Sequence, residues 1–207
     1  MTRALYIGMI SGTSRDGVDA ALVSFKKGQP NIHEAICVPY PSDLAKSLQL
    51  AVMTGCRPAE SVLESLDEEL ATHLSLTVKQ LLQKAGVARQ DVKAIGSHGQ
   101  TVWHEPDGPR PESIQLGDPQ HIAHETGIRT VGDFRRADIE AGGQGAPLAP
   151  LLHRALFTPG AGVSSATRIV LNLGGIANIS VIDQEGGVSG FDTGPANCLL
   201  DAWIQKH

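Results

Sequence analysis

The sequence predicts an α/β fold in which a unit of three strands and a helix begins twice. Near the N-terminus, short apolar stretches alternate with small and polar residues, as strands joined by turns do. Apolar residues then recur at steps of three and four between Leu63 and Leu81, which places them on one helical face. From residue 167 a second pair of apolar stretches surrounds a Gly-rich turn, so the opening design starts again.

The first unit consists of three expected strands and one long helix. The strands cover residues 4–10, 18–25 and 31–40 and form an antiparallel meander. In the helix, acidic residues lie early and lysines lie late, which matches the helix dipole. Gly86 is a suitable end for this helix, which we expect to be scaffold.

The middle and the end of the chain continue the alternation. We expect a strand at 92–100 that ends in a polar turn, a Pro-rich surface loop at 104–118, a short helix capped by Asp118 and ended by Gly127, and a strand at 128–134. Further along we expect a hinge at the Gly-rich residues 141–147, a helix to about Phe157, two strands within 167–183, a short strand, a Gly-Pro turn and a final helix. On this basis residues 1–140 form a first domain, and residues 141–207 form a hinge with the incomplete start of a second domain.

Composition excludes several functional classes. The chain of 207 residues has a formal net charge of −5 and no basic run, so neither nucleic acid nor an anionic membrane is an expected partner. No apolar stretch is long enough to span a membrane. Cys37, Cys56 and Cys198 are far apart, and His121 and His124 lack the spacing of a zinc motif. We therefore expect no disulfide framework and no zinc site, and a cytoplasmic location.

The loop SGTSRDG, Ser11 to Gly17, is longer and more polar than a hairpin turn requires. It lacks the lysine and the following helix of a Walker phosphate loop. Its backbone N–H groups and hydroxyls can form an anion-binding concavity, in which Asp16 would hold a hydrated Mg²⁺ shared with the phosphates. The alternative is an ordinary loop in which Asp16-Gly17 makes the turn.

Polar residues gather again at a strand end, in the segment SHGQTVWHEP (97–106). Ligands bind at strand ends of open α/β sheets, and side chains with both donors and acceptors suit a sugar. We expect contacts to such a substrate from Ser97, His98, Gln100 and Thr101. The alternative is a polar turn whose groups satisfy one another.

Two arginines, Arg135 and Arg136, precede the Gly-rich hinge. A guanidinium group presents a fork of donors to a carboxylate or phosphate, so we expect both to contact substrate. The alternative for either arginine is a surface ion pair with Asp133 or Asp138, which contributes little energy.

Asp192 follows an expected strand in the segment GFDTGPAN (190–197). It precedes Gly194-Pro195, where we expect a helix to begin with Pro195 at its first position. A carboxylate near a helix N-terminus is stabilised in its ionised form by the helix dipole. Asp192 is therefore either a base of modest strength or a helix cap.

Units of three strands and a helix occur in duplicate in the actin/hexokinase-like ATPases, where the nucleotide lies in the cleft between two domains. Six segments of this sequence together resemble the anhydro-N-acetylmuramic acid kinase family: GTSRDGVDA, GSHGQTVWHEP, QLGDP, VGDFRRADIEAGGQGAPLAP, LNLGGIANIS and GFDTGPANCLLDAWI. They occur in family order from Gly8 to the end of the chain. The resemblance implies an actin/hexokinase-like fold in a bacterial cytoplasmic enzyme, and it is compatible with a homodimer of the full-length protein.

The reaction implied by the resemblance uses ATP, Mg²⁺ and water. It opens the anhydro bridge of 1,6-anhydro-N-acetylmuramic acid and phosphorylates the 6-hydroxyl, giving N-acetylmuramic acid 6-phosphate in cell-wall recycling. The implied partners are therefore an amino sugar and ATP. Asp192 matches the family's catalytic aspartate, which takes a proton from the attacking water. The family's ATP loop matches Gly12, Thr13, Ser14, Arg15, Asp16, Gly17, Val18 and Asp19, and the phosphates would be held from the second domain by Gly174 and Gly175.

The family's adenosine-binding segment and the rest of its second domain have no counterpart in these 207 residues. We therefore expect an N-terminal fragment that lacks useful kinase activity by itself. The alternative function is a non-catalytic sugar-binding or regulatory module derived from such a kinase.

Overall fold

The computed structural model describes residues 4–12, 14–157 and 166–207, so Thr13 of the expected ATP loop lies outside the described residues. The chain folds into two compact units, Met1–Gly145 and Ala146–His207. The division falls within the Gly-rich segment 141–147 that the sequence marks as a hinge. Among the helices of the described residues, none combines the length and the apolar character needed to cross a membrane.

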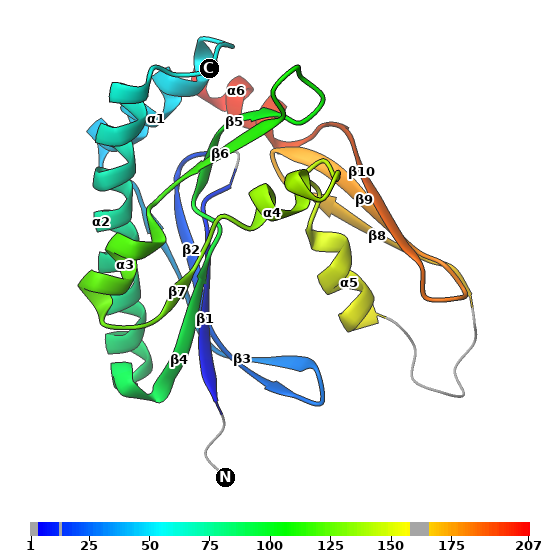
Figure 1. Ribbon diagram of the computed structural model, residues 1–207, viewed down its shortest axis with the longest axis horizontal. Helices are drawn as coiled ribbons and strands as arrows, with labels where there is room; N and C mark the ends of the chain where they lie inside the picture. The colour runs from blue at the N-terminus through cyan, green and yellow to red at the C-terminus, as the bar shows by residue number, and fades with distance from the viewer. Residues whose placement is uncertain (1–3, 13, 158–165) are drawn as a thin grey trace. The chain divides into compact units, whose positions relative to one another are not determined.

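The first unit is built on a mixed sheet of five strands (Figure 1). Its strands are β1 (Leu5–Ile10), β2 (Gly17–Lys26), β3 (Gln29–Pro39), β4 (Val92–Ser97) and β7 (Thr130–Val131), in the order β3-β2-β1-β4-β7. The antiparallel meander expected at the N-terminus is confirmed by the pairing of β1 with β2 and of β2 with β3. Strand β4 joins β1 in parallel, so β1 and β4 end at the same edge of the sheet, where Ser11 and His98 begin the following loops.

Helices cover one face of this sheet. They are α1 (Ser42–Met53), α2 (Glu60–Ala85) and α3 (Pro119–Thr126), while α4 (Phe134–Glu140) follows β7 and a short 3₁₀ helix, Arg89–Asp91, precedes β4. Gly86 ends α2 in a left-handed conformation, as expected. The side chain of Asp118 accepts hydrogen bonds from the backbone N–H groups of Gln120 and His121, which confirms the predicted cap of α3.

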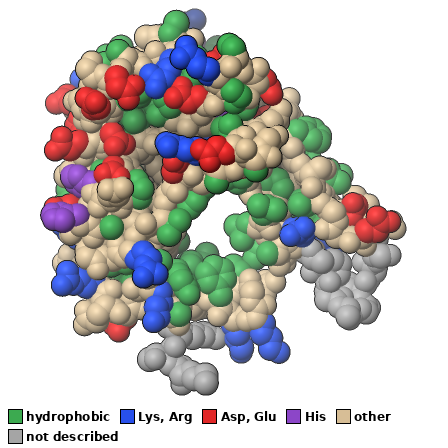
Figure 2. Space-filling model, in the orientation of Figure 1, with side chains coloured by type: hydrophobic (Ala, Val, Ile, Leu, Met, Phe, Trp, Pro, Cys, Tyr) green, Lys and Arg blue, Asp and Glu red, His purple; other side chains and the backbone are tan. Residues whose placement is uncertain are grey.

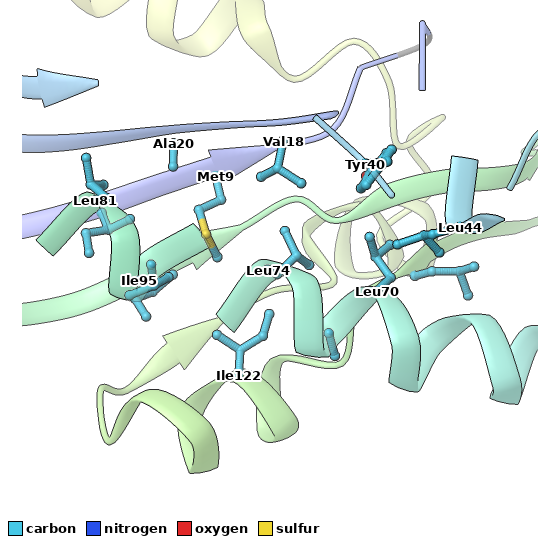
Figure 3. Close-up of a cluster of buried hydrophobic side chains, with 14 of the residues drawn as sticks. Met9, Val18, Ala20, Tyr40, Leu44, Leu70, Leu74, Leu81, Ile95 and Ile122 are labelled. Atoms are coloured by element: carbon cyan, nitrogen blue, oxygen red, sulfur yellow. The ribbon is translucent and has the colours of Figure 1, made fainter. Parts of the chain in front are cut away.

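The core of the first unit lies between α2 and the sheet (Figure 3). Leu70, Leu74 and Leu81 project from α2 and are fully buried, as their spacing predicts. They meet Met9 of β1 and Ile122 of α3. Burying each of these side chains contributes on the order of 1.5–3 kcal/mol relative to exposure. On the opposite, solvent-facing side of the helices, acidic and basic side chains are interspersed (Figure 2).

Two predictions for the first unit are wrong. The predicted surface loop at 104–118 is mostly the antiparallel hairpin of β5 (Gln100–Glu105) and β6 (Glu112–Leu116), because the prolines are confined to its connection. The predicted strand at 128–134 is reduced to the two residues of β7. Asp133 takes a left-handed backbone conformation there, and α4 begins at the next residue.

The second unit contains α5 (Ala149–Phe157), β8 (Arg168–Leu173), β9 (Ile176–Ile182), β10 (Val188–Pro195) and α6 (Asn197–Lys206). Its antiparallel sheet has the order β10-β9-β8, so the second hairpin around the Gly-rich turn is confirmed. The expectation that Pro195 starts a helix is wrong. Pro195 is the last residue of β10, paired with Ile176, and α6 begins two residues later.

Apolar side chains of the second unit are largely exposed within the described residues. On α6, Leu199, Leu200, Trp203 and Ile204 are each more than 60% exposed. Ile169, Leu171 and Leu173 on the edge strand β8 are exposed as well. Hydrophobic side chains also reach the surface at α5 (Figure 2). An apolar edge strand of this kind favours aggregation.

Candidate active site

The loop from Ser11 to Asp16 connects β1 to β2 and is anchored at both ends. At its start, the buried Ser11 hydroxyl donates to Gln100 Oε1 at 2.6 Å, and the Ser11 backbone N–H donates to the Gly99 carbonyl at 3.3 Å. At its end, the Tyr40 backbone N–H donates to the Asp16 carbonyl at 3.0 Å. Both ends of the loop are therefore held by segments far away in the sequence.

Two exposed side chains of the loop, those of Ser14 and Asp16, are accessible to an anion or a cation. Ser14 Oγ donates to Asp16 Oδ1 at 2.8 Å, and both side chains are exposed. Arg15 adopts a left-handed backbone (φ 54°), and its N–H donates to the Gly12 carbonyl. Gly17 has no room for a side chain, because a Cβ there would lie 2.5 Å from the Val38 carbonyl oxygen. Glycine is thus required where the loop enters β2.

The two remaining residues of the expected ATP loop lie on β2 and face opposite sides of the sheet. Val18 is fully buried in the core, so any contact it makes to a nucleotide would come from its backbone. Asp19 is exposed and lies beside Cys37. Burial is the main cause that raises the pKa of the Cys37 thiol, and the nearby Asp19 carboxylate raises it further.

The bend between β4 and β5 holds the four polar residues expected at a sugar site, and it divides them into two groups. Gln100 is buried and used internally: it accepts from Ser11 and donates to the Thr101 carbonyl at 3.0 Å. Thr101 Oγ1 accepts from Gln115 at 3.3 Å. Ser97 and His98, by contrast, line a cavity. The Ser97 hydroxyl is buried without a hydrogen-bond partner among the described residues, which leaves it able to bind a ligand or water.

Gly99 gives this bend its shape. Its φ is 67°, a conformation that favours glycine, and a Cβ there would collide with the Leu116 carbonyl oxygen. The close approach lets β5 and β6 pair from Gln100 and Leu116 onward. The hairpin therefore starts directly beside the cavity.

The two arginines of α4 have different partners. Arg136 Nε lies 2.8 Å from Asp133 Oδ2, so the ion pair considered as an alternative is present for this residue. Arg135 Nε instead donates to His98 Nε2 at 3.1 Å. The Asp138 carboxylate accepts the Gly145 backbone N–H and thereby holds the Gly-rich segment.

One cavity of the first unit has a volume of about 660 Å³ and brings together segments singled out in the sequence. Its walls come from the bend after β4, from β6, from the start of α3 and from α4. Ser97, His98 and Arg136 are the expected site residues that line it. Ser113 and Gln115 of β6 also line it, and they were not predicted as site residues because the neighbouring prolines indicated a loop.

In the second unit, the Gly174-Gly175 turn is bonded to the start of α6. The Gly174 carbonyl accepts the Asn197 N–H at 2.9 Å, and the Gly175 carbonyl accepts the Ala196 N–H at 3.0 Å. Asp192 lies on β10 opposite Asn178, is exposed, and stands next to an irregularity in the pairing. The alternative of Asp192 as a helix cap is wrong, because α6 is preceded by Ala196 and has no side-chain cap.

Removal of the Ser11 hydroxyl tests whether the opening loop is held by the bend after β4. We expect Ser11→Ala to reduce the free energy of unfolding by about 1–3 kcal/mol, because a buried amide oxygen loses its donor. Ser14→Ala, which removes an exposed hydroxyl of the same loop, should change it by less than about 0.5 kcal/mol. Urea denaturation measures both, and equal effects would contradict the anchoring role of Ser11.

The topology and these segments define an α/β protein with an actin/hexokinase-like fold, as the sequence predicts. The solved structure of a reductive activator for a corrinoid, iron–sulfur protein is similar over 94% of this chain and 32% of its own, with a TM-score of 0.51 and 13% identity. The sequence model of the anhydro-N-acetylmuramic acid kinase family matches residues 4–207. The chain belongs to that family.

Two curated relatives show the extent of the match. Anhydro-N-acetylmuramic acid kinase of Vibrio vulnificus (strain CMCP6) is 47% identical over 206 residues, which are 100% of this chain and 54% of the relative. The corresponding kinase of Xanthomonas campestris pv. campestris (strain 8004) is 46% identical over 206 residues, covering 98% of this chain and 54% of the relative. The chain thus spans about half the length of the curated relatives it matches.

Proposed function

We propose that this chain is the N-terminal part of a kinase that uses ATP and water to convert 1,6-anhydro-N-acetylmuramic acid to N-acetylmuramic acid 6-phosphate in the cytoplasm. The observation that carries the proposal is the family match over residues 4–207. The geometry of the first unit supports it, since the polar loop is hydrogen-bonded through Ser11 to the bend after β4, and the same bend lines a cavity.

Asp192 is the proposed catalytic base. Cleavage of a glycosidic bond generally uses one carboxylate as acid and another as base. Here the departing 6-oxygen would capture the γ-phosphoryl group, so the phosphorus replaces the proton that an acid would supply. One carboxylate then suffices, and Asp192 would take the proton of the water that attacks the anomeric carbon. Its exposure on β10 leaves the carboxylate accessible to water.

The loop that follows β1, with its exposed Ser14 and Asp16, and the Gly174-Gly175 turn would bind the phosphates. Phosphoryl transfer depends mainly on positioning and on stabilisation of negative charge. A single exposed carboxylate, that of Asp16, fits Mg²⁺, which commonly binds one or two protein carboxylates together with substrate phosphates and water. The metal would neutralise charge on the phosphates of ATP.

The experiment joins residues 1–207 to the part of the Vibrio vulnificus kinase that follows the matched region. We expect the fusion to phosphorylate the anhydro sugar in an ATP-dependent manner and residues 1–207 alone to show no turnover, because half of the relatives' length is then missing. Mass spectrometry of the sugar product measures the reaction. A fusion that binds the sugar without phosphorylating it would favour the non-catalytic module instead.

A further inference from the structure

The side-chain amide of Gln115 on β6 is held through its nitrogen, and its oxygen is left unused. Nε2 donates to Ser113 Oγ at 2.8 Å and to Thr101 Oγ1 at 3.3 Å. The Ser113 hydroxyl donates in turn to the Trp103 carbonyl at 3.5 Å, so its oxygen is the acceptor for Gln115. These bonds orient the amide. In the part of the molecule that the structure describes, Oε1 is buried and has no hydrogen-bond partner.

Ser97, the last residue of β4, provides a second unused group on the wall of the same cavity. Its side chain is 2% exposed, and its hydroxyl has no partner among the described residues. Ser97 and Gln115 both line the cavity of about 660 Å³. Buried polar groups are nearly always hydrogen-bonded, so two unpartnered groups at one cavity favour a ligand that supplies their partners.

The charges of the cavity disfavour an anion as that ligand group. Carboxylates outnumber guanidinium groups among the lining residues, which include Asp67, Glu112, Asp118, Asp133 and Glu140 but only Arg136 of the opposite charge. The Arg136 guanidinium is already paired with Asp133. The negative potential of such a cavity repels a carboxylate and tolerates a neutral group that carries its own hydrogen-bond donor.

A secondary amide has the two groups that this wall requires. Its N–H can donate to Gln115 Oε1, and its carbonyl can accept from the Ser97 hydroxyl. Apolar surface for a methyl group lies beside Ser97. A Cβ at Gly132 would be 3.2 Å from both the Ser97 carbonyl oxygen and the Pro119 ring, and these residues all line the cavity. The sugar of the proposed function carries one such amide, the acetamido group at C2.

We infer that Gln115 and Ser97 bind the 2-acetamido group of the sugar and thereby select N-acetylated sugars over sugars with a hydroxyl at C2. The inference rests on the proposed function for the identity of the ligand. A 2-hydroxyl lacks the carbonyl and the methyl group, so it makes fewer contacts with this wall. We expect the cavity to prefer the acetamido sugar at least about tenfold, as sites built to hydrogen-bond a substrate group do.

Two neutral sugars that differ only at C2, 1,6-anhydro-N-acetylglucosamine and 1,6-anhydroglucose, test this selection. NMR titration of residues 1–207 measures the affinity for each sugar. The wild-type preference should fall below about threefold in Gln115→Met and in Ser97→Ala, because each variant removes one group that the acetamido group uses. Gln83→Met, at an exposed glutamine of α2, is the matched control and should keep the full preference. Retained binding of 1,6-anhydroglucose shows that a variant is folded.

The outcomes separate the inference from the proposed function, which is tested by phosphorylation of the anhydro sugar by the fusion. Equal binding of the two sugars by the wild type, or an unchanged preference in either variant, would overturn the inference even if the fusion is active. The expected preferences in a fusion without kinase activity would support the inference and contradict the proposed function.

If the wild type binds neither sugar, N-methylacetamide, a small molecule with the same secondary amide, becomes the probe. The side-chain amide signals of Gln115 then report on binding. A shift of these signals that is lost in Ser97→Ala would support the inference. Absence of any shift, or a shift that persists in Ser97→Ala, would overturn it.

Discussion

Replacing Asp192 by asparagine is expected to lower turnover of the completed kinase by about 10²- to 10⁴-fold, the range that a general base contributes. The amide is nearly isosteric with the carboxylate but cannot accept a proton from the attacking water. The measurement uses the fusion of residues 1–207 with the second half of a relative. Binding of ATP should be retained, because Asp192 is not among the groups proposed to hold the phosphates.

Asp201→Asn is the matched control for this experiment, since Asp201 is an exposed aspartate on α6 of the same unit. It should leave turnover unchanged. Equal losses in the two variants would point to a general effect of charge or folding. Full turnover in Asp192→Asn would remove Asp192 as the base and require another group to activate water.

Shortening Leu74 to alanine is expected to destabilise the first unit by about 2–5 kcal/mol, because it leaves a cavity at the centre of the core. Leu74 is fully buried on α2. Its side chain packs against Gly117, and a Cβ added at Gly117 would collide with it. The loss is large compared with the marginal stability of a typical domain, about 5–15 kcal/mol. Chemical denaturation followed by circular dichroism measures it.

Leu76, two residues further along α2, provides the control because its side chain is 48% exposed. Leu76→Ala preserves the helix and should change the free energy of unfolding by less than about 0.5 kcal/mol. If the two variants are equally stable, the packing of α2 against the sheet described for Leu74 is incorrect.

Helix α2 and the N-terminal meander were predictable because their patterns are local. The three-to-four spacing of the leucines places them on one face whatever that face meets, and the structure buries Leu70, Leu74 and Leu81. The cap of α3 was predictable for the same reason, since Asp118 acts on the two residues that follow Pro119. Each of these features depends on residues within a few positions of one another.

The β5–β6 hairpin was not predictable, because the prolines of its connection outweighed the short alternation of the strands. The start of α6 was also misplaced. Gly-Pro is a common way to open a helix, but Pro195 pairs with Ile176 and prolongs β10. In both cases pairing with another strand decided the secondary structure against the local prediction. The strand that pairs is set by the arrangement of the sheet and cannot be read from the segment itself.

In the candidate site, too, local features were predictable from the sequence and long-range contacts were not. From the sequence alone, Ser11 to Gly17 is a polar hairpin loop, Ser97 to Thr101 is a polar strand end, and Arg135 and Arg136 are equivalent. Only the tertiary structure joins Ser11 to Gln100 across 89 positions and His98 to Arg135 across 37. The sequence by itself determined the family, the strands of the meander and the composition of the site, because these depend on residue type and local spacing. The tertiary structure decided which polar groups are used internally and which line the cavity, because hydrogen-bond partners distant in sequence are selected only when β1 and β4 meet in the sheet.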